Sequence, residues 1–190
     1  MKSQFNVSVD QDAVERARMY LQGMPGGLQK AFSLAANRAI DRGKTAAAKA
    51  VTQDYTIRSS DVKRTFRIQK FTPNSATGEI VSKGRRIPLM KFRHRPAGVA
   101  ETTGSGQRQI RVEAQRGKPK VLPRGFKHKG QIFTRVGPGR YPIVHLKEIS
   151  VPEMLSEDGR HEMVEQVIAE TLSERLDHET KRLMEKKRSG

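Results

Sequence analysis

The chain contains no cysteine and no tryptophan, and only 5% of its 190 residues are aromatic. Without cysteine, neither a disulfide bond nor a thiolate metal site can form, and nothing in the composition indicates an oxidising compartment. Hydrophobic residues make up 35% of the chain and the mean hydropathy is −0.70. We therefore expect a small hydrophobic core, together with extended parts that become ordered on assembly.

Long apolar runs are also missing. The first ten residues do not contain the apolar stretch of a signal peptide. No segment approaches the roughly 18 consecutive apolar residues that a membrane-spanning helix needs. These patterns predict a soluble protein that is first cytoplasmic and has no membrane partner.

Acidic residues are scarce in the middle of the chain. The segment from Thr56 to Lys147 holds 22 Lys or Arg residues and 4 acidic residues, a formal charge of +18, whereas the whole chain carries +17. The flanking segments together are therefore close to neutral. Such segregated charge indicates a polyanionic neighbour for the middle of the chain.

The basic segment centres on residues 84–96, where cationic side chains surround a short apolar stretch interrupted by Pro88. Proline in a strand favours an edge position, and a strand so highly charged is expected to stay at the surface. A second basic cluster follows at residues 118–129. Lys and Arg residues of this kind neutralise phosphates without reading sequence. The candidate phosphate-facing or inter-subunit residues are Arg85, Arg86, Lys91, Arg93, Arg95, Arg116, Lys118, Lys120, Arg124, Lys127 and Lys129.

Length and hydrophobic periodicity predict one α+β domain, in which helices pack on an antiparallel sheet. The long helices are expected at residues 28–54 and, after an interruption near Gly159, at residues 160–187. The other expected elements are a strand at 3–9, a helix at 11–22 with Asp10 as its N-cap, a short helix within 56–66 capped by Ser59 or Ser60, strands at 66–71, 78–83 and 87–92 with a hairpin turn at 82–85, and strands at 130–137 and 143–149.

Residues 93–130 are rich in Gly, Pro, Lys, Arg and Thr. A connection of this length is uncommon in a compact domain and is generally functional or disordered. We expect a long, poorly packed basic arm or hairpin that becomes ordered against a partner, with one strand at residues 109–114.

The sequence does not predict an enzyme. His161 with Glu165, and Glu174 with His178, lie one helical turn apart, but a metal site needs three or four convergent ligands, so solvated ion pairs are expected. Gly43-Lys44-Thr45 lacks the glycine and the preceding strand of a phosphate-binding loop. A two-metal nuclease needs several carboxylates together. The acids of the middle segment are instead scattered, at Asp61, Glu79, Glu101 and Glu113. We expect no cofactor and no metal.

Aromatic residues near the basic segment are few: Phe92, Phe126, Phe133 and Tyr141. They lack the spacing of the stacking platforms that read RNA or single strands. Contact with nucleic acid is therefore expected to involve the phosphate backbone without base readout. A solvated basic face, or one that meets an acidic protein, is the alternative.

Short motifs give the chain a resemblance to a known family. They are Ala-Ala-Asn-Arg-Ala-Ile at 35–40, Lys-Gly-Arg-Arg-Ile-Pro-Leu at 83–89, Gly-Arg-Tyr-Pro-Ile at 139–143 and Ile-Ser-Val-Pro at 149–152. With the length and the basic character, they resemble the phage minor tail protein Z family, the tail-completion proteins of long-tailed bacteriophages. The likeness runs from Leu28 to the C-terminal helix, and residues 1–27 match least.

The resemblance implies a non-enzymatic virion component that completes the head-proximal end of the tail. It implies a homo-oligomeric ring, sixfold if it follows the tail tube, which contacts a tail terminator or tail tube and neck or connector proteins and has DNA in its lumen. Residues 84–129 would supply inter-subunit contacts and a phosphate-facing surface. A stand-alone basic nucleic-acid-binding protein is the alternative, and a metal-dependent nuclease using Asp61 or Glu113 is a third, for which we expect no activity.

Overall fold

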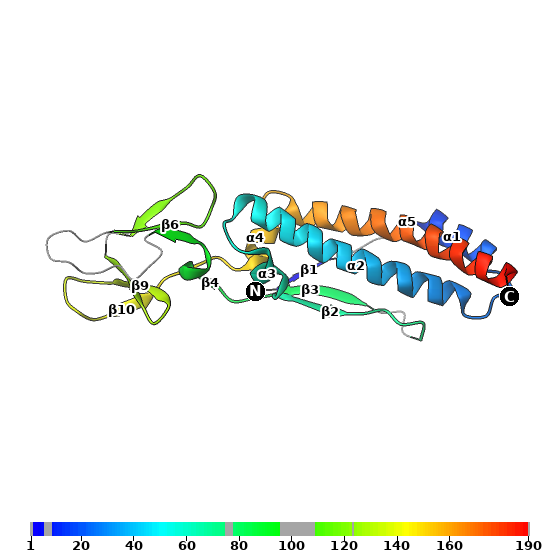
Figure 1. Cartoon of the computed structure of the whole chain (residues 1–190), viewed down its shortest axis with the longest axis horizontal. Helices are drawn as coiled ribbons and strands as arrows, with labels where there is room; N and C mark the ends of the chain where they lie inside the picture. The colour runs from blue at the N-terminus through cyan, green and yellow to red at the C-terminus, as the bar shows by residue number, and fades with distance from the viewer. Residues whose placement is uncertain (1, 6–8, 75–77, 96–108, 123, 190) are drawn as a thin grey trace.

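The computed structural model describes residues 2–5, 9–74, 78–95, 109–122 and 124–189. The chain has an α+β fold, which confirms the predicted fold class. Figure 1 shows an elongated molecule with a helical body at one end and a β-rich end at the other. We use "helical body" for residues 2–83 and 150–189, and "β-rich end" for residues 84–149. The helices are α1 (Gln11–Tyr20), α2 (Gly27–Asp54), α3 (Ser59–Lys63), α4 (Val151–Ser156) and α5 (Arg160–Arg188), with a 3₁₀ turn η1 at Leu89–Lys91.

Two long antiparallel helices, α2 and α5, form the helical body (Figure 1). At 1.5 Å per residue each is roughly 40 Å long. The predicted apolar stripe of α5 lies against α2, and α1 packs on α5. Many contact residues of α2 are alanines, whose small side chains let the two helices approach closely. The buried residues of α5 are Arg160, Val164, Ile168, Leu172, Leu176, Thr180 and Leu183.

Gly43 lies in the middle of α2, where the backbone faces Ile168 of α5. A Cβ atom at this position would contact Cγ1 of Ile168 and lie 2.6 Å from its Cδ1. Glycine here therefore serves close helix packing, and Gly43-Lys44-Thr45 is helical backbone.

Substitution of Gly43 by alanine is expected to lower the free energy of unfolding by about 1 kcal/mol. Overpacking costs about 1–3 kcal/mol, and the higher helix propensity of alanine returns up to about 1 kcal/mol. Urea unfolding of Gly43→Ala, Ile168→Ala and the double variant measures the coupling. Because Ile168→Ala removes both crowded atoms, the double variant should lose at least about 1 kcal/mol less than the two single losses added together. Strict additivity would contradict close packing at Gly43.

A three-stranded antiparallel sheet lies along the helical body, in the order β1–β3–β2 (Figure 1). Its strands are β1 (Lys2–Gln4), β2 (Phe66–Gln69) and β3 (Glu79–Lys83). Phe5, Phe66 and Ile80 are buried between the sheet and the helices. Beyond the end of β2, the Asn37 side chain of α2 donates to the carbonyl of Phe71 at 2.9 Å and accepts from its N–H at 3.0 Å.

The β-rich end is built from three further small antiparallel sheets, ordered β5–β6–β7, β8–β9–β10 and β4–β11. The strands are β4 (Ile87–Pro88), β5 (Arg93–Arg95), β6 (Ile110–Glu113), β7 (Lys120–Leu122), β8 (Gly125–His128), β9 (Gln131–Arg135), β10 (Ile143–His145) and β11 (Lys147–Glu148). One hydrophobic cluster joins both parts of the molecule, because Phe92, Ile110 and Ile132 are buried together with residues of the helical body.

Most predicted elements are present, and their partners differ from the prediction at several places. Asp10 caps α1 as predicted and accepts from the N–H of Asp12 at 3.0 Å. The prediction that Ser59 or Ser60 caps α3 is wrong, because Arg58 holds the N-cap position. The predicted strand at 143–149 is divided into β10 and β11, which pair with β9 and β4 respectively.

The predicted hairpin around residues 82–85 is wrong. β3 pairs with β1 and β2, whereas β4 pairs with β11. The expected strand at 87–92 is only two residues long, and the chain continues as the 3₁₀ turn η1. Pro88 has no N–H to donate, which favours this short edge strand.

The described part of residues 93–130 is not a poorly packed arm, which corrects the sequence-based expectation. It forms β5 to β8, and Ile110 and Val112 of β6 are buried in the core. The strand predicted at 109–114 is confirmed as β6. Residues 96–108, which also belong to the predicted arm, lie outside the described residues.

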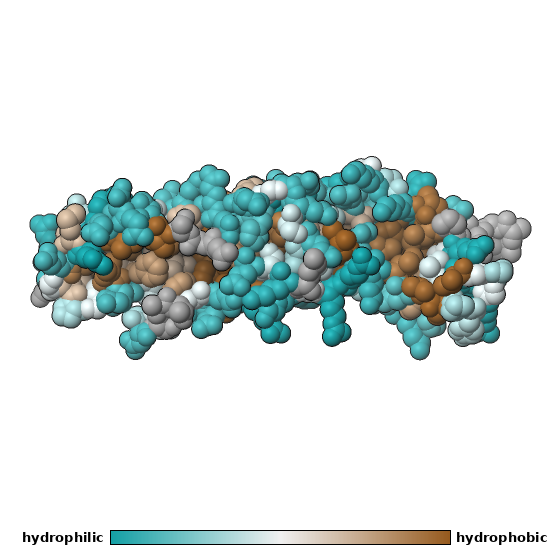
Figure 2. All heavy atoms as spheres, turned by 180° about the vertical axis from the view of Figure 1, so that it is seen from behind, coloured by the Kyte–Doolittle hydropathy of each residue, from teal (hydrophilic) through white to brown (hydrophobic). Residues whose placement is uncertain are grey.

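Hydrophilic side chains cover most of the face seen in Figure 2, and apolar side chains reach the surface in both the helical body and the β-rich end. Exposed apolar residues of the β-rich end include Val121, Val136, Tyr141 and Val144. Among the described helices, none combines the length and apolar character that crossing a bilayer requires.

Candidate nucleic-acid interface

All eleven candidate cations lie in the β-rich end. Ten of them are exposed, and Lys127 on β8 is partly buried. Burial lowers the pKa of the Lys127 ammonium group. The basic surface predicted from the sequence therefore lies at one end of an elongated molecule (Figure 1).

Most of these cations form no close ion pair. Among the residues that the structure describes, no carboxylate lies within 4.0 Å of seven candidates, although the charge of Arg86, after the hydrogen bond from the Ser150 N–H, still lowers the pKa of the Glu153 carboxyl group. These seven, which we call the unpaired cations, are Arg85, Arg86, Arg95, Lys118, Lys120, Arg124 and Lys129.

Two candidates form ion pairs with the few acids of the basic segment. The Lys91 ammonium lies 3.0 Å from Asp61, and the Arg93 guanidinium lies 3.5 Å from Glu113. The Gly117 N–H donates to Glu113 at 2.9 Å, and this hydrogen bond, with the charge of Arg93, lowers the pKa of the Glu113 carboxyl group. Asp61 thus holds the Lys91 side chain, and Glu113 holds the Arg93 side chain and the turn at Gly117. Both acids therefore have a structural role.

Arg116 is exposed, and its side chain also has a partner in the helical body. Its Nε and Nη2 atoms donate to the carbonyl of Thr52 at 3.1 and 3.0 Å, and its backbone N–H donates to the carbonyl of Asp54 at 2.7 Å. These carbonyls belong to the last turn of α2, which lacks further intrahelical donors. The Arg116 side chain therefore fastens the β6–β7 turn to the helical body.

Substitution of Arg116 by methionine is expected to lower the free energy of unfolding by about 1 kcal/mol, because a charge-assisted cap of a helix C-terminus is lost. Arg124→Met is the matched control, since Arg124 is an exposed, unpaired cation and its loss should change stability by less than about 0.5 kcal/mol. Thermal and urea unfolding of both variants measure the difference. Equal stability of the two variants would contradict the capping role.

The backbone around Tyr55 and Thr56 completes the junction between the two parts of the molecule. The N–H of Thr56 donates to the carbonyl of Ala114 at 2.9 Å, and its hydroxyl donates to the carbonyl of Glu113. The same hydroxyl accepts from the N–H of Arg93 at 2.9 Å. β5 and β6 are therefore hydrogen-bonded directly to the segment that follows α2.

Two hollows lie beside this junction. The larger, of about 480 Å³, is a basic cleft lined by Arg58, Lys91, Arg93 and His94, with Asp61 at its wall. Arg58 comes from the segment before α3, Lys91 comes from η1, and Arg93 and His94 come from β5. The fold thus gathers basic side chains from distant segments around one cleft.

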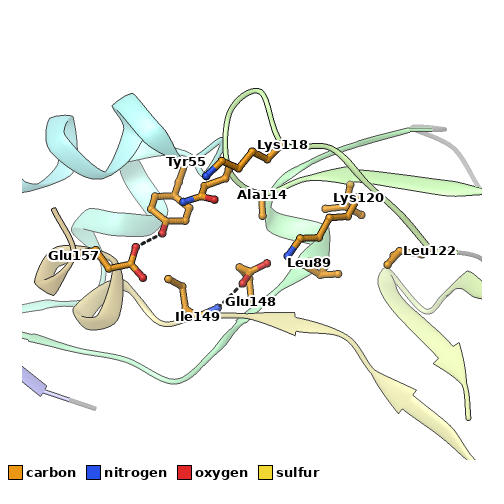
Figure 3. Close-up of a pocket in the computed structure, with 11 residues that line it drawn as sticks. Tyr55, Leu89, Ala114, Lys118, Lys120, Leu122, Glu148, Ile149 and Glu157 are labelled. Carbon is orange, nitrogen blue, oxygen red and sulfur yellow. Dashed lines mark hydrogen bonds between the residues drawn. The ribbon is translucent and has the colours of Figure 1, made fainter.

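The smaller hollow, of about 200 Å³, has apolar walls that include Leu89, Val112 and Ile149. Figure 3 shows Lys118 extending toward Tyr55, and Lys120 toward Glu148. The residues that line this smaller hollow come from both the helical body and the β-rich end, so the hollow lies at the junction between them.

Tyr55 is the buried polar group of this pocket. Its hydroxyl donates to Oε2 of Glu157 at 2.6 Å (Figure 3), and the guanidinium of Arg160 lies 5.7 Å from its ring centre. Burial, followed by the hydrogen bond to Glu157, raises the pKa of the Tyr55 hydroxyl well above its ordinary value. A phenol that keeps its proton so firmly acts as a hydrogen-bond donor, and it is a poor base.

Of the two histidine–carboxylate pairs predicted on α5, the structure shows that of His161 with Glu165, whereas His178 lies 3.8 Å from Glu179. His161 Nε2 lies 3.3 Å from Glu165, its Nδ1 lies 3.2 Å from the hydroxyl of Ser3, and its ring stacks on Phe5 with 4.6 Å between the ring centres. Within the described ranges, no three His, Asp or Glu side chains converge as a metal site requires.

The sequence did not indicate Arg58 or Tyr55 as parts of the interface. Arg58 precedes the five-residue α3, and Tyr55 is the C-cap of the 28-residue α2. Both come close to residues of the β-rich end only through long-range contacts. The available signal for Arg58 was its position as a single cation after the uncharged stretch Tyr55-Thr56-Ile57. No local pattern signals the pairing of Tyr55 with Glu157.

Comparison with known proteins gave no significant match: no protein-family model fits the chain, and no curated protein or solved structure is similar to it.

Proposed function

We propose that this chain is a non-enzymatic structural component of a bacteriophage tail or neck. In this proposal it completes the head-proximal end of the tail as a homo-oligomeric ring and supports head–tail joining and DNA passage. The ring contacts a tail terminator or tail tube on one side and neck or connector proteins on the other.

One observation carries the proposal. The seven unpaired cations all lie in the β-rich end of an elongated subunit, whereas the segments outside Thr56–Lys147 carry a formal charge of −1. If such subunits are arranged around a closed axis with their basic ends inward, the cations line a channel. A channel of this kind attracts a polyanion such as DNA without reading its sequence.

The exposed apolar side chains support an assembled state. Val136 and Tyr141 are 60% and 69% exposed in the loop region between β9 and β10, and Met19 and Tyr20 are 63% and 59% exposed at the end of α1. These two places lie in opposite parts of the molecule. Contacts with neighbouring subunits, or with the proteins on either side of the ring, would cover these side chains.

Localisation in particles tests this proposal. Virions purified from cells that produce the tagged, full-length chain are analysed by mass spectrometry and cryo-electron microscopy. We expect density for several copies at the junction of head and tail, with the β-rich end toward the axis. A chain that stays monomeric and is missing from particles would refute the proposal.

A stand-alone nucleic-acid-binding protein is the second candidate, because the same basic end favours it. That function predicts tight binding of DNA or RNA by the isolated monomer, with affinity that falls steeply as salt rises. A monomer that binds duplex DNA tightly at about 0.15 M salt and is not incorporated into particles would establish this second candidate.

A further inference from the structure

The two faces of the sheet β8–β9–β10 differ at its central strand, β9. On β9, Ile132 is fully buried within the hydrophobic cluster. Phe133 points to the opposite face, because neighbouring residues of a strand alternate between faces. Phe133 and Phe126 are partly exposed and do not belong to the hydrophobic cluster of the described residues.

Three rings form a row across this outer face. Phe126 of β8 is directly opposite Phe133 of β9, which is directly opposite His145 of β10. The ring centres of Phe126 and Phe133 are 6.0 Å apart with planes inclined by 25°, and those of Phe133 and His145 are 5.1 Å apart with planes inclined by 34°. The ring of His128 lies 6.4 Å from Phe133. We call these four residues the aromatic row.

Positive charge accompanies the aromatic row. Arg135 lies on the same face, and its guanidinium carbon is 4.7 Å from the ring centre of Phe126. Lys129, in the turn between β8 and β9, and Arg140, in the loop between β9 and β10, are exposed at the two ends of the sheet. The residues that share this face by register are Phe126, His128, Gln131, Phe133, Arg135, Ile143 and His145, and none of them is acidic.

From this arrangement we propose that the outer face of β8–β9–β10 binds single-stranded nucleic acid by stacking unpaired bases on the aromatic row. Partly exposed rings offer a stacking surface to any base. Nearby Arg and Lys side chains contact the phosphates that join the stacked bases. Duplex DNA hides its base faces, so it uses the basic end through its backbone alone. The proposal does not depend on the phage-tail function, because it concerns a different ligand state and a different face.

The aromatic row could not be recognised in the sequence, because its members come from three strands. Phe126, Phe133 and His145 are separated by irregular intervals in the chain, and only the strand register brings them into line. The expectation of backbone contact without stacking is therefore replaced by this proposal for unpaired bases.

Fluorescence anisotropy with the full-length protein tests the proposal. The probes are a labelled oligothymidylate of about 20 nucleotides and a duplex of the same length. Phe133→Leu and Phe126→Leu keep an apolar side chain and remove the ring. Each should weaken binding of the single strand by about 5- to 100-fold and leave duplex binding within about twofold. Tyr141→Leu is the matched control, because Tyr141 is an exposed aromatic outside the aromatic row.

A second variant reports stacking directly. The chain contains no tryptophan, so Phe133→Trp introduces a single indole whose fluorescence is quenched when a base stacks on it. We expect near-normal affinity and strong quenching by the oligothymidylate, with little quenching by the duplex. Circular dichroism confirms that all variants are folded.

The following outcomes would overturn the proposal. Single-strand binding by folded Phe133→Leu and Phe126→Leu that equals wild type would show that only the backbone is contacted. Loss of self-association in these variants, with unchanged nucleic-acid binding, would assign the face to a contact between copies. Neither outcome bears on incorporation into particles, so failure here is distinguishable from failure of the proposed tail function.

Discussion

Substitution of Arg160 by methionine is expected to lower the free energy of unfolding by about 3 kcal/mol. Arg160 is the first residue of α5, and its side chain is almost fully buried. Its Nε and Nη2 donate to Asp54 Oδ2 at 3.0 and 2.7 Å, its Nη2 also donates to Asp158 at 2.8 Å, and its Nη1 donates to the carbonyl of Met154 at 2.8 Å. These bonds join the end of α2, the end of α4 and the start of α5.

Removing one member of a buried ion network usually costs about 3–5 kcal/mol, because charges and carbonyls are left without partners. We expect the lower end of that range here. The Asp54 side chain is 52% exposed, so its carboxylate regains water when the guanidinium is lost. The carbonyl of Met154 has less access to water, since Met154 itself is fully buried. Methionine fills much of the space of the arginine stem, which limits the loss from packing.

Urea unfolding followed by circular dichroism measures the effect of Arg160→Met. Arg175→Met is the control, because Arg175 is exposed on the same helix and its substitution should change stability by less than about 0.5 kcal/mol. Arg160→Lys keeps the charge but has no planar fork for several acceptors, and it should recover only part of the loss. A decrease below about 1 kcal/mol for Arg160→Met would show that the network contributes little to folding.

The long helices could be predicted from the sequence because their information is local. Val164, Ile168, Leu172 and Leu176 recur at a spacing close to one helical turn, and all four are buried in α5 as predicted. The break at Gly159 is also local, since this residue adopts a φ of +67° that favours glycine. Periodicity and turn chemistry were sufficient at these places.

The pairing of the strands could not be predicted in the same way. The stretch from Ser82 to Arg85 has the composition of a turn, yet β3 pairs with β1 and β2, and β4 pairs with β11 about 60 residues further on. Which strand lies beside which depends on long-range burial, above all of Ile110, Val112 and Ile132. The same dependence hid the capping role of Arg116 and the aromatic row.

Ten of the eleven candidate cations are exposed, and their separate contacts are visible only in the structure. A local sequence shows that Lys and Arg are abundant. It does not show that Asp61 and Glu113 pair with Lys91 and Arg93, or that Arg116 caps α2. The unpaired cations are the candidates for the proposed contact with a polyanion, and their removal gives the sharpest functional test of the basic end.

Replacing four of the unpaired cations by glutamine, in the variant Arg95→Gln, Lys120→Gln, Arg124→Gln and Lys129→Gln, is expected to weaken binding of duplex DNA by about 10²- to 10³-fold near 0.15 M salt. Each phosphate contact releases about one counterion, so the slope of log affinity against log salt should fall by about 3–4. None of the four side chains has a carboxylate within 4.0 Å among the described residues, so folding stability should change little.

The matched control removes the same charge from the helical body. Lys30, Arg38, Arg42 and Lys49 are exposed on α2, and changing all four to glutamine gives a protein of equal net charge. If the basic end contacts the phosphates, this control keeps most of its affinity and nearly the full salt slope. If DNA responds only to the total charge, the two variants weaken equally. Titration of both variants over a series of salt concentrations therefore decides whether the position of the cations, or merely their number, attracts the polyanion.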